Sequence, residues 1–151
     1  MNRKVSIFIE GIVRGEDESR IITKAIGQYR RLDDMHILRY MESDVKKDKK
    51  SNDTDNNSIT RDEDCVNTIK ISQGLVEMIK NGENSTHMFF DLSRATQSVY
   101  DTPYGSLYFQ IQTAKIDLEE KVNELNLLME YSLSHENSHI SDNQIRIVVN
   151  E

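Results

Sequence analysis

Apolar and polar residues alternate over most of this chain, which is the pattern of a β-strand with one buried face. The alternation is regular from Lys4 to Val13, and β-rich runs follow from Arg20 to Arg31 and from Met35 to Glu42. Successive side chains of a strand point to opposite faces, so each run can bury one face and expose the other. The N-terminal part therefore predicts three strands, joined by turns at 15–19 and 33–34.

Extended segments also fill the chain beyond a polar stretch that follows these runs. One set extends from Cys65 to Leu92, and another extends from Ser98 to Asn150. Asn81-Gly82 favours a tight hairpin, because both central residues of a type I′ turn need positive φ. Thr102-Pro103-Tyr104-Gly105 is typical of a turn, since proline fixes φ and glycine has no side chain to clash. Short segments separated by such turns predict an all-β fold.

One segment, 118–133, fits two periods. Leu118, Val122, Leu125 and Met129 have the spacing of an amphipathic helix. Alternate apolar positions from Leu125 to Leu133 instead fit a strand. We favour a strand that starts near Glu124, with residues 118–123 forming the turn before it.

Residues 43–64 are polar throughout except for Val45 and Ile59. A stretch rich in Asp, Asn, Ser, Thr and Lys cannot bury enough apolar surface to fold alone. We therefore expect a long, mobile loop at 43–64 between two strands.

Composition narrows the classes of protein that the chain can represent. A chain of 151 residues suits one domain, here 1–151, and its net charge of −7 argues against nucleic acid as a partner. The single cysteine, Cys65, excludes an intramolecular disulfide. No stretch resembles a signal peptide or a membrane span, so we expect a cytoplasmic protein without a membrane partner. No catalytic constellation or cofactor-binding loop stands out, and we expect no cofactor.

Several motifs, taken in order, resemble those of the YwiB-like family. They are Thr102-Pro103-Tyr104-Gly105-Ser106-Leu107, Thr113, Ile116, Tyr131-Ser132-Leu133 and Asn143-Gln144-Ile145, and the similarity covers nearly the whole chain. This is a family of small bacterial proteins, mostly from Gram-positive species, labelled as a domain of unknown function.

The resemblance implies a calycin-like fold, which is a closed antiparallel β-barrel of about eight strands, similar in shape to lipocalins. It implies a strand at 124–133, and it makes the 43–64 loop look like a surface insertion. The chain contains no tryptophan, so it lacks the Gly-x-Trp signature of lipocalins.

The segment His135-Glu136-Asn137-Ser138-His139 matches the H-E-x-x-H motif of zinc metallopeptidases. That motif works on a helix, which places both histidines on one face with the glutamate beside the metal-bound water. Serine and asparagine are poor helix formers, and both flanks have strand periodicity, so we favour a polar hairpin turn. The competing hypothesis is a metal-dependent hydrolase whose surface site would use His135, His139 and Asp142.

The candidate ligand-binding residues are mainly aromatic. A small barrel either packs its interior with side chains or holds one small ligand. Aromatic side chains with a hydroxyl group suit either role. The candidates are Tyr29, Tyr40, Phe90, Tyr100, Tyr104 and Tyr131, with Phe109 as a further aromatic and Arg94 as a possible partner for a buried anion.

The leading hypothesis is a non-enzymatic protein that binds a small, partly apolar ligand in or at the mouth of the barrel. The alternative is a protein-interaction module that acts through a barrel face or the 43–64 loop.

Overall fold

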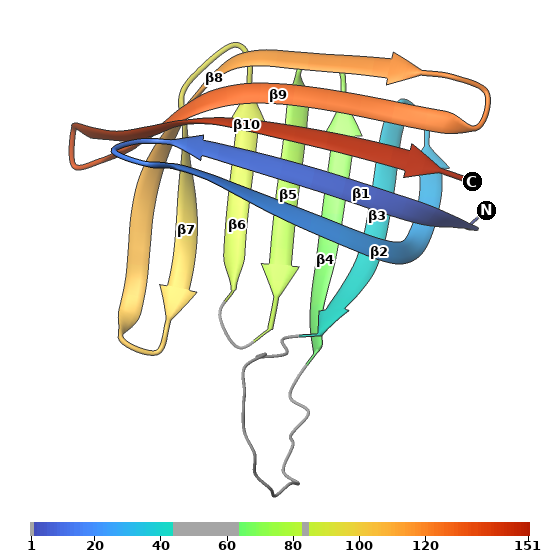
Figure 1. Ribbon diagram of the computed structural model, residues 1–151, viewed down its shortest axis with the longest axis horizontal. Helices are drawn as coiled ribbons and strands as arrows, with labels where there is room; N and C mark the ends of the chain where they lie inside the picture. Colours follow the sequence, from blue (N-terminus) through green and yellow to red (C-terminus); the bar gives the residue numbers. More distant parts are fainter. Residues whose placement is uncertain (1, 44–63, 83–84) are drawn as a thin grey trace, which may run out of the picture.

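The computed structural model describes residues 2–43, 64–82 and 85–151, and this described part contains ten β-strands (Figure 1). Among the described residues, no helix has the length and apolarity needed to cross a membrane. The strands are β1 (Arg3–Arg14), β2 (Glu18–Leu32), β3 (Met35–Ser43), β4 (Asp64–Ser72), β5 (Leu75–Asn81), β6 (Thr86–Asp91), β7 (Thr96–Thr102), β8 (Gly105–Glu120), β9 (Glu124–His135) and β10 (Ser138–Asn150).

The ten strands form one closed barrel in which every neighbouring pair is antiparallel. Each strand pairs with the next one in sequence, and β1 closes the barrel against β10 from Ser6↔Asn150 to Arg14↔Asp142. The predicted all-β antiparallel barrel is confirmed, and its closure supports the calycin-like class. The prediction of about eight strands is wrong. That number came from the family resemblance.

The barrel is flattened into two layers whose strands cross. In Figure 1, β1, β9 and β10 lie across β4, β5 and β6. Strand β8 starts beside β7 in one layer and ends beside β9 in the other. Its register shifts between Thr113 and Lys115, and such a bulge lets a strand bend from one layer into the next.

The burial pattern of β9 shows whether segment 118–133 contains a helix or a strand. Leu125, Leu127, Met129 and Tyr131 are buried, and the residues between them are half-buried. The strand prediction is therefore confirmed. The turn is shorter than predicted, because β8 continues to Glu120 and leaves only residues 121–123 between the strands.

The β5–β6 connection differs from its prediction, and most of the predicted 43–64 loop lies outside the described residues. The last pair of the β5–β6 hairpin is Lys80↔Thr86, so its connection is longer than the predicted two-residue turn at Asn81-Gly82. Of the loop predicted at 43–64, residues 44–63 lie outside the described residues, and Ser43 pairs with Asp64 as the ends of β3 and β4.

Gly27 lies where β2 runs between β1 and β3. A Cβ atom there would lie 2.5 Å from the Arg39 carbonyl oxygen and 2.9 Å from Ile7 Cδ1. Real atoms do not approach this closely, so the position requires glycine. The glycine brings the end of β2 against β3 and so helps to form the mouth described next.

Candidate functional site

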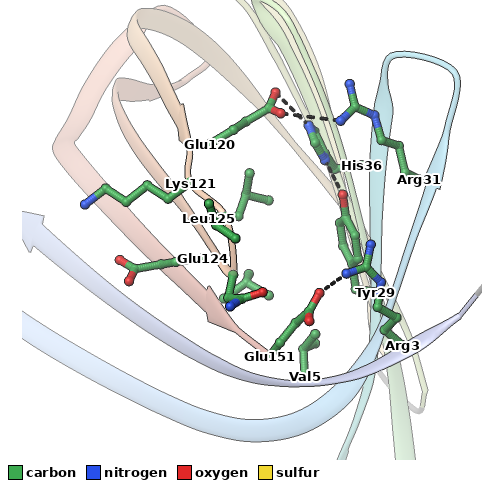
Figure 2. Close-up of a pocket in the computed structure, with 13 residues that line it drawn as sticks. Arg3, Val5, Tyr29, Arg31, His36, Glu120, Lys121, Glu124, Leu125 and Glu151 are labelled. Carbon is green, nitrogen blue, oxygen red and sulfur yellow. Dashed lines mark hydrogen bonds and ion pairs between the residues drawn. The ribbon is translucent and has the colours of Figure 1, made fainter.

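A cavity of about 160 Å³ opens at one mouth of the barrel, where β1 begins, β10 ends and the β8–β9 turn lies (Figure 2). We call this the β8–β9 mouth. Its lining combines charged, polar and apolar side chains. The lining residues are Arg3, Val5, Tyr29, Arg31, His36, Lys121, Val122, Asn123, Leu125 and Val149, together with the glutamates at 120, 124 and 151.

Three polar side chains from three strands form a hydrogen-bonded chain at this mouth. The Tyr29 hydroxyl of β2 lies 2.7 Å from Nδ1 of His36 on β3, and Nε2 of His36 lies 3.2 Å from Oε2 of Glu120 on β8. A carboxylate only accepts hydrogen bonds, so Nε2 carries the proton that bonds to Glu120. In this tautomer Nδ1 is the acceptor, and the Tyr29 hydroxyl donates to it. His36 is only 2% exposed, so this chain satisfies both nitrogens of a buried ring.

Two arginines lie beside this chain. Arg31 Nη1 lies 3.4 Å from Oε1 of Glu120, and Arg3 forms an ion pair with Glu151. The Arg3 guanidinium also lies over the ring of Tyr29, 5.7 Å from its centroid. Figure 2 shows Arg3, Tyr29 and Glu151 close together, with His36 placed between Tyr29 and Glu120. The mouth therefore presents guanidinium groups that can bind an anion.

Burial raises the pKa of Tyr29. The positive charges of Arg31 and Arg3 oppose this increase, and the negative charge of Glu120 adds to it. The net result keeps the phenol neutral at physiological pH, so Tyr29 acts as a hydrogen-bond donor. The lining also has an apolar part, because Val5, Leu125 and Val149 contribute buried side chains. The mouth can thus receive a molecule with one polar end and one apolar end.

The predicted aromatic residues do not form one site. Tyr29 lines the mouth, whereas Tyr40, Phe90 and Tyr131 are buried in the core. Phe90 and Tyr131 are in contact, with ring centroids 4.8 Å apart in an edge-on arrangement. Burial raises the pKa of Tyr131 to about 12, and burial with the nearby Glu42 charge does the same for Tyr40.

The other candidates lie on the surface. Tyr104 is 98% exposed at the β7–β8 turn, and Tyr100 is also exposed. Arg94 has an exposed side chain, and its Nε donates to Oδ2 of Asp91, 3.1 Å away in the same turn. The structure thus places Arg94 on the surface and not beside a buried anion, because Asp91 already holds it in the β6–β7 connection.

The H-E-x-x-H segment forms the hairpin turn that the polar pattern favours. His135 ends β9, and His139 lies in β10. Glu136 and Asn137 have φ of 51° and 67°, which is the left-handed geometry of a tight hairpin and not of a helix. His139 Nε2 lies 3.0 Å from Asp142 Oδ1, but within the described residues no three potential ligands are grouped around a metal position.

His36, Arg3 and Glu120 were not predicted as site residues from the sequence. His36 carried a signal, because it shares the inward face of its strand with Leu38 and Tyr40. Glu120 carried none, since it is 84 residues from His36 and one of many glutamates. Barrel closure alone places these residues together.

Comparisons with known proteins identify a family and a fold. The profile of DUF1934, described as a domain of unknown function, matches residues 55–147. No curated protein matches the chain. Among solved structures, the crystal structure of the ywiB protein from Bacillus subtilis is similar, with a TM-score of 0.78 and 14% sequence identity. The match covers 99% of this chain and 92% of that chain. At this identity the likeness concerns the fold alone.

Proposed function

Because this chain belongs to the DUF1934 family, whose domain has no assigned function, we propose a role from the barrel itself: it binds a small, partly apolar molecule at the β8–β9 mouth. Membership confirms the resemblance to YwiB-like proteins noted in the sequence. The observation that carries the proposal is the buried His36, held between Tyr29 and Glu120 beside a cavity flanked by two arginines.

A purely structural role explains this arrangement poorly. The buried ring of His36 avoids the cost of unsatisfied polar atoms only because Tyr29 and Glu120 bond its two nitrogens, whereas an apolar side chain would fill the same space without needing such partners. Polar groups that converge on a cavity with an apolar wall are instead typical of small-molecule sites.

The ion pair at the mouth suggests the chemistry of the ligand's polar end. The Glu151 carboxylate already occupies the position in front of Arg3. A carboxylate of the ligand would bind Arg3 there by displacing Glu151, and its apolar chain would lie against Val5, Leu125 and Val149. The cavity of about 160 Å³ limits the ligand to a short chain. We therefore expect a small aliphatic carboxylate.

The direct test is an NMR titration of isotope-labelled protein with hexanoate, with hexan-1-ol as the matched probe that lacks the carboxylate. We expect hexanoate to shift the signals of mouth residues and hexan-1-ol to have at least tenfold weaker affinity. Glu151→Gln removes the competing carboxylate and should strengthen hexanoate binding several-fold. Arg3→Gln should abolish it.

The control is Tyr104→Phe, since Tyr104 lies on an exposed turn. Tyr29→Phe should weaken hexanoate binding, and Tyr104→Phe should leave it unchanged. Signals that do not move at the mouth, or equal affinity for hexanoate and hexan-1-ol, would contradict the carboxylate. Native mass spectrometry of freshly purified protein adds a second readout, because a bound molecule would add its own mass.

The alternative function, a protein-interaction module, has one observation in its favour. The β7–β8 hairpin exposes Tyr104, Leu107 and Tyr108, and exposed apolar groups of this kind often mark protein contacts. Under this alternative, replacing Tyr104 and Tyr108 by serine would abolish concentration-dependent association in sedimentation experiments. Hexanoate binding would not change.

A further inference from the structure

A polar row crosses the inside of the barrel in the part of β9 away from the β8–β9 mouth. Thr113 of β8 lies opposite Tyr131 of β9, and Tyr131 lies opposite Asn143 of β10. Cross-strand partners point to the same face of a sheet, so the three side chains are neighbours. All three are buried, with Thr113 4% and Asn143 6% exposed.

Two polar atoms of this row have no partner within the described part of the protein. Thr113 Oγ1 and Asn143 Oδ1 are both buried and make no hydrogen bond. Tyr131 lies between these two residues in the row. Proteins satisfy nearly all buried polar groups, so two exceptions in one row on an inward face point to a partner molecule that the protein itself does not supply.

Apolar residues surround the row on the same face. Ile111 and Leu133 form the cross-strand pair on one side of Thr113 and Tyr131, and Ile116 and Met129 form the pair on the other. The orphaned atoms therefore cannot be satisfied by adjacent side chains of β8 and β9. A partner must come from the barrel interior.

The charge of the row decides the class of ligand. Its side chains are an alcohol, a phenol and an amide, and none carries a charge at physiological pH. Burial raises the pKa of Tyr131 to about 12, so its phenol keeps its proton. A charged ligand would lose its hydration here without meeting an opposite charge. A neutral molecule that both donates and accepts hydrogen bonds would match the row.

We propose that Thr113, Tyr131 and Asn143 form a second, interior binding site for a small neutral molecule with amide or alcohol groups. The site is separate from the β8–β9 mouth. Tyr131 lies six residues along β9 from Leu125, which lines that mouth, and at about 3.3 Å per residue the separation is roughly 20 Å. The site therefore does not depend on the function proposed for the mouth.

The test uses acetamide as the probe, with the wild-type protein and two threonine variants. Acetamide should shift the Thr113 methyl signal in NMR, and a crystal soaked in acetamide should show it within hydrogen-bonding distance of Thr113 Oγ1 or the Asn143 amide. Thr113→Val keeps the shape of the side chain and removes its hydroxyl, so it should weaken acetamide binding at least tenfold.

Thr96→Val is the matched control. The Thr96 hydroxyl donates to the carbonyl oxygen of Phe89, so its loss should lower stability without changing acetamide affinity. Two results with the wild-type protein together would overturn the proposal, whether or not the variants fold. They are an acetamide titration that leaves the Thr113 methyl signal in place and a soaked crystal that shows only water in the row. A Thr113→Val variant that binds acetamide like wild type would also overturn it.

Discussion

The Tyr29 hydroxyl lies 2.7 Å from Nδ1 of His36, and the two rings also stack with centroids 5.8 Å apart. The two residues lie on adjacent strands of one hairpin, and the contact fixes the orientation of a buried imidazole. The opposite edge of that imidazole bonds to Glu120 across the mouth. Through His36, Tyr29 of β2 is therefore connected to Glu120 of β8 on the other side of the mouth.

Tyr29→Phe tests the structural importance of that contact. The substitution leaves Nδ1 of the buried His36 without a donor, and an unsatisfied buried group costs about 1–3 kcal/mol. We expect the free energy of unfolding, measured by urea denaturation, to fall by this amount. Tyr104→Phe is the control and should change it by less than about 0.5 kcal/mol, because Tyr104 is exposed. Equal effects of the two variants would rule out this interpretation of the contact.

The buried tyrosines predict a loss of stability at high pH. The pKa of Tyr40 and of Tyr131 is raised to about 12 in the folded protein from 10.0 for the free side chain. Below pH 10 both states keep the proton, so the tyrosines cause no change. Between pH 10 and 12 the unfolded chain releases protons that the folded one retains, so stability falls as pH rises.

Each of these tyrosines contributes on the order of 2 kcal/mol to that fall. Denaturation curves recorded from pH 8 to pH 12 measure it. Tyr131→Phe should make the pH dependence shallower, and Tyr104→Phe should leave its slope unchanged. A Tyr131→Phe variant with the wild-type slope would show that this phenol titrates normally.

Gly27 and Gly11 form a matched pair for testing close strand packing. A Cβ at Gly27 would collide with the Arg39 carbonyl and Ile7, whereas nothing lies within 4 Å of one at Gly11. Gly27→Ala should therefore lower the free energy of unfolding by about 1–3 kcal/mol. Gly11→Ala should leave it unchanged or raise it by about 0.4–1 kcal/mol. Thermal denaturation of both variants provides the comparison, and the reverse order would refute the packing argument.

Glu136 tests the hairpin interpretation of the H-E-x-x-H segment. Its φ of 51° suits asparagine or glycine better than glutamate. Glu136→Asn should therefore raise stability by roughly 0.5 kcal/mol. In a metalloprotease the same change would remove the general base and abolish peptide hydrolysis. Equal stability of the two proteins would indicate that the turn tolerates glutamate without strain.

Sequence periodicity determined the class of fold, because alternation of period two admits few structures other than a sheet with one buried face. Leu125, Leu127 and Met129 show this directly, since their spacing is local and their burial follows from it. Turn chemistry was equally local, so Asp33-Asp34, Thr102–Gly105 and the His135–His139 hairpin could be predicted. The predicted length of the turn before β9 was wrong, because Leu118 and Val122 alone do not show where β8 ends.

The candidate site was decided only by tertiary structure. Tyr29 could be selected from the sequence as an aromatic residue with a hydroxyl group, but its partners could not. Glu120 meets His36 across 84 residues, and Arg3 meets Glu151 across 148. No local pattern encodes such pairs, because they depend on β1 closing against β10 and on the bend of β8 between the layers. The sequence determined which residues face inward, and closure of the barrel decided which of them meet.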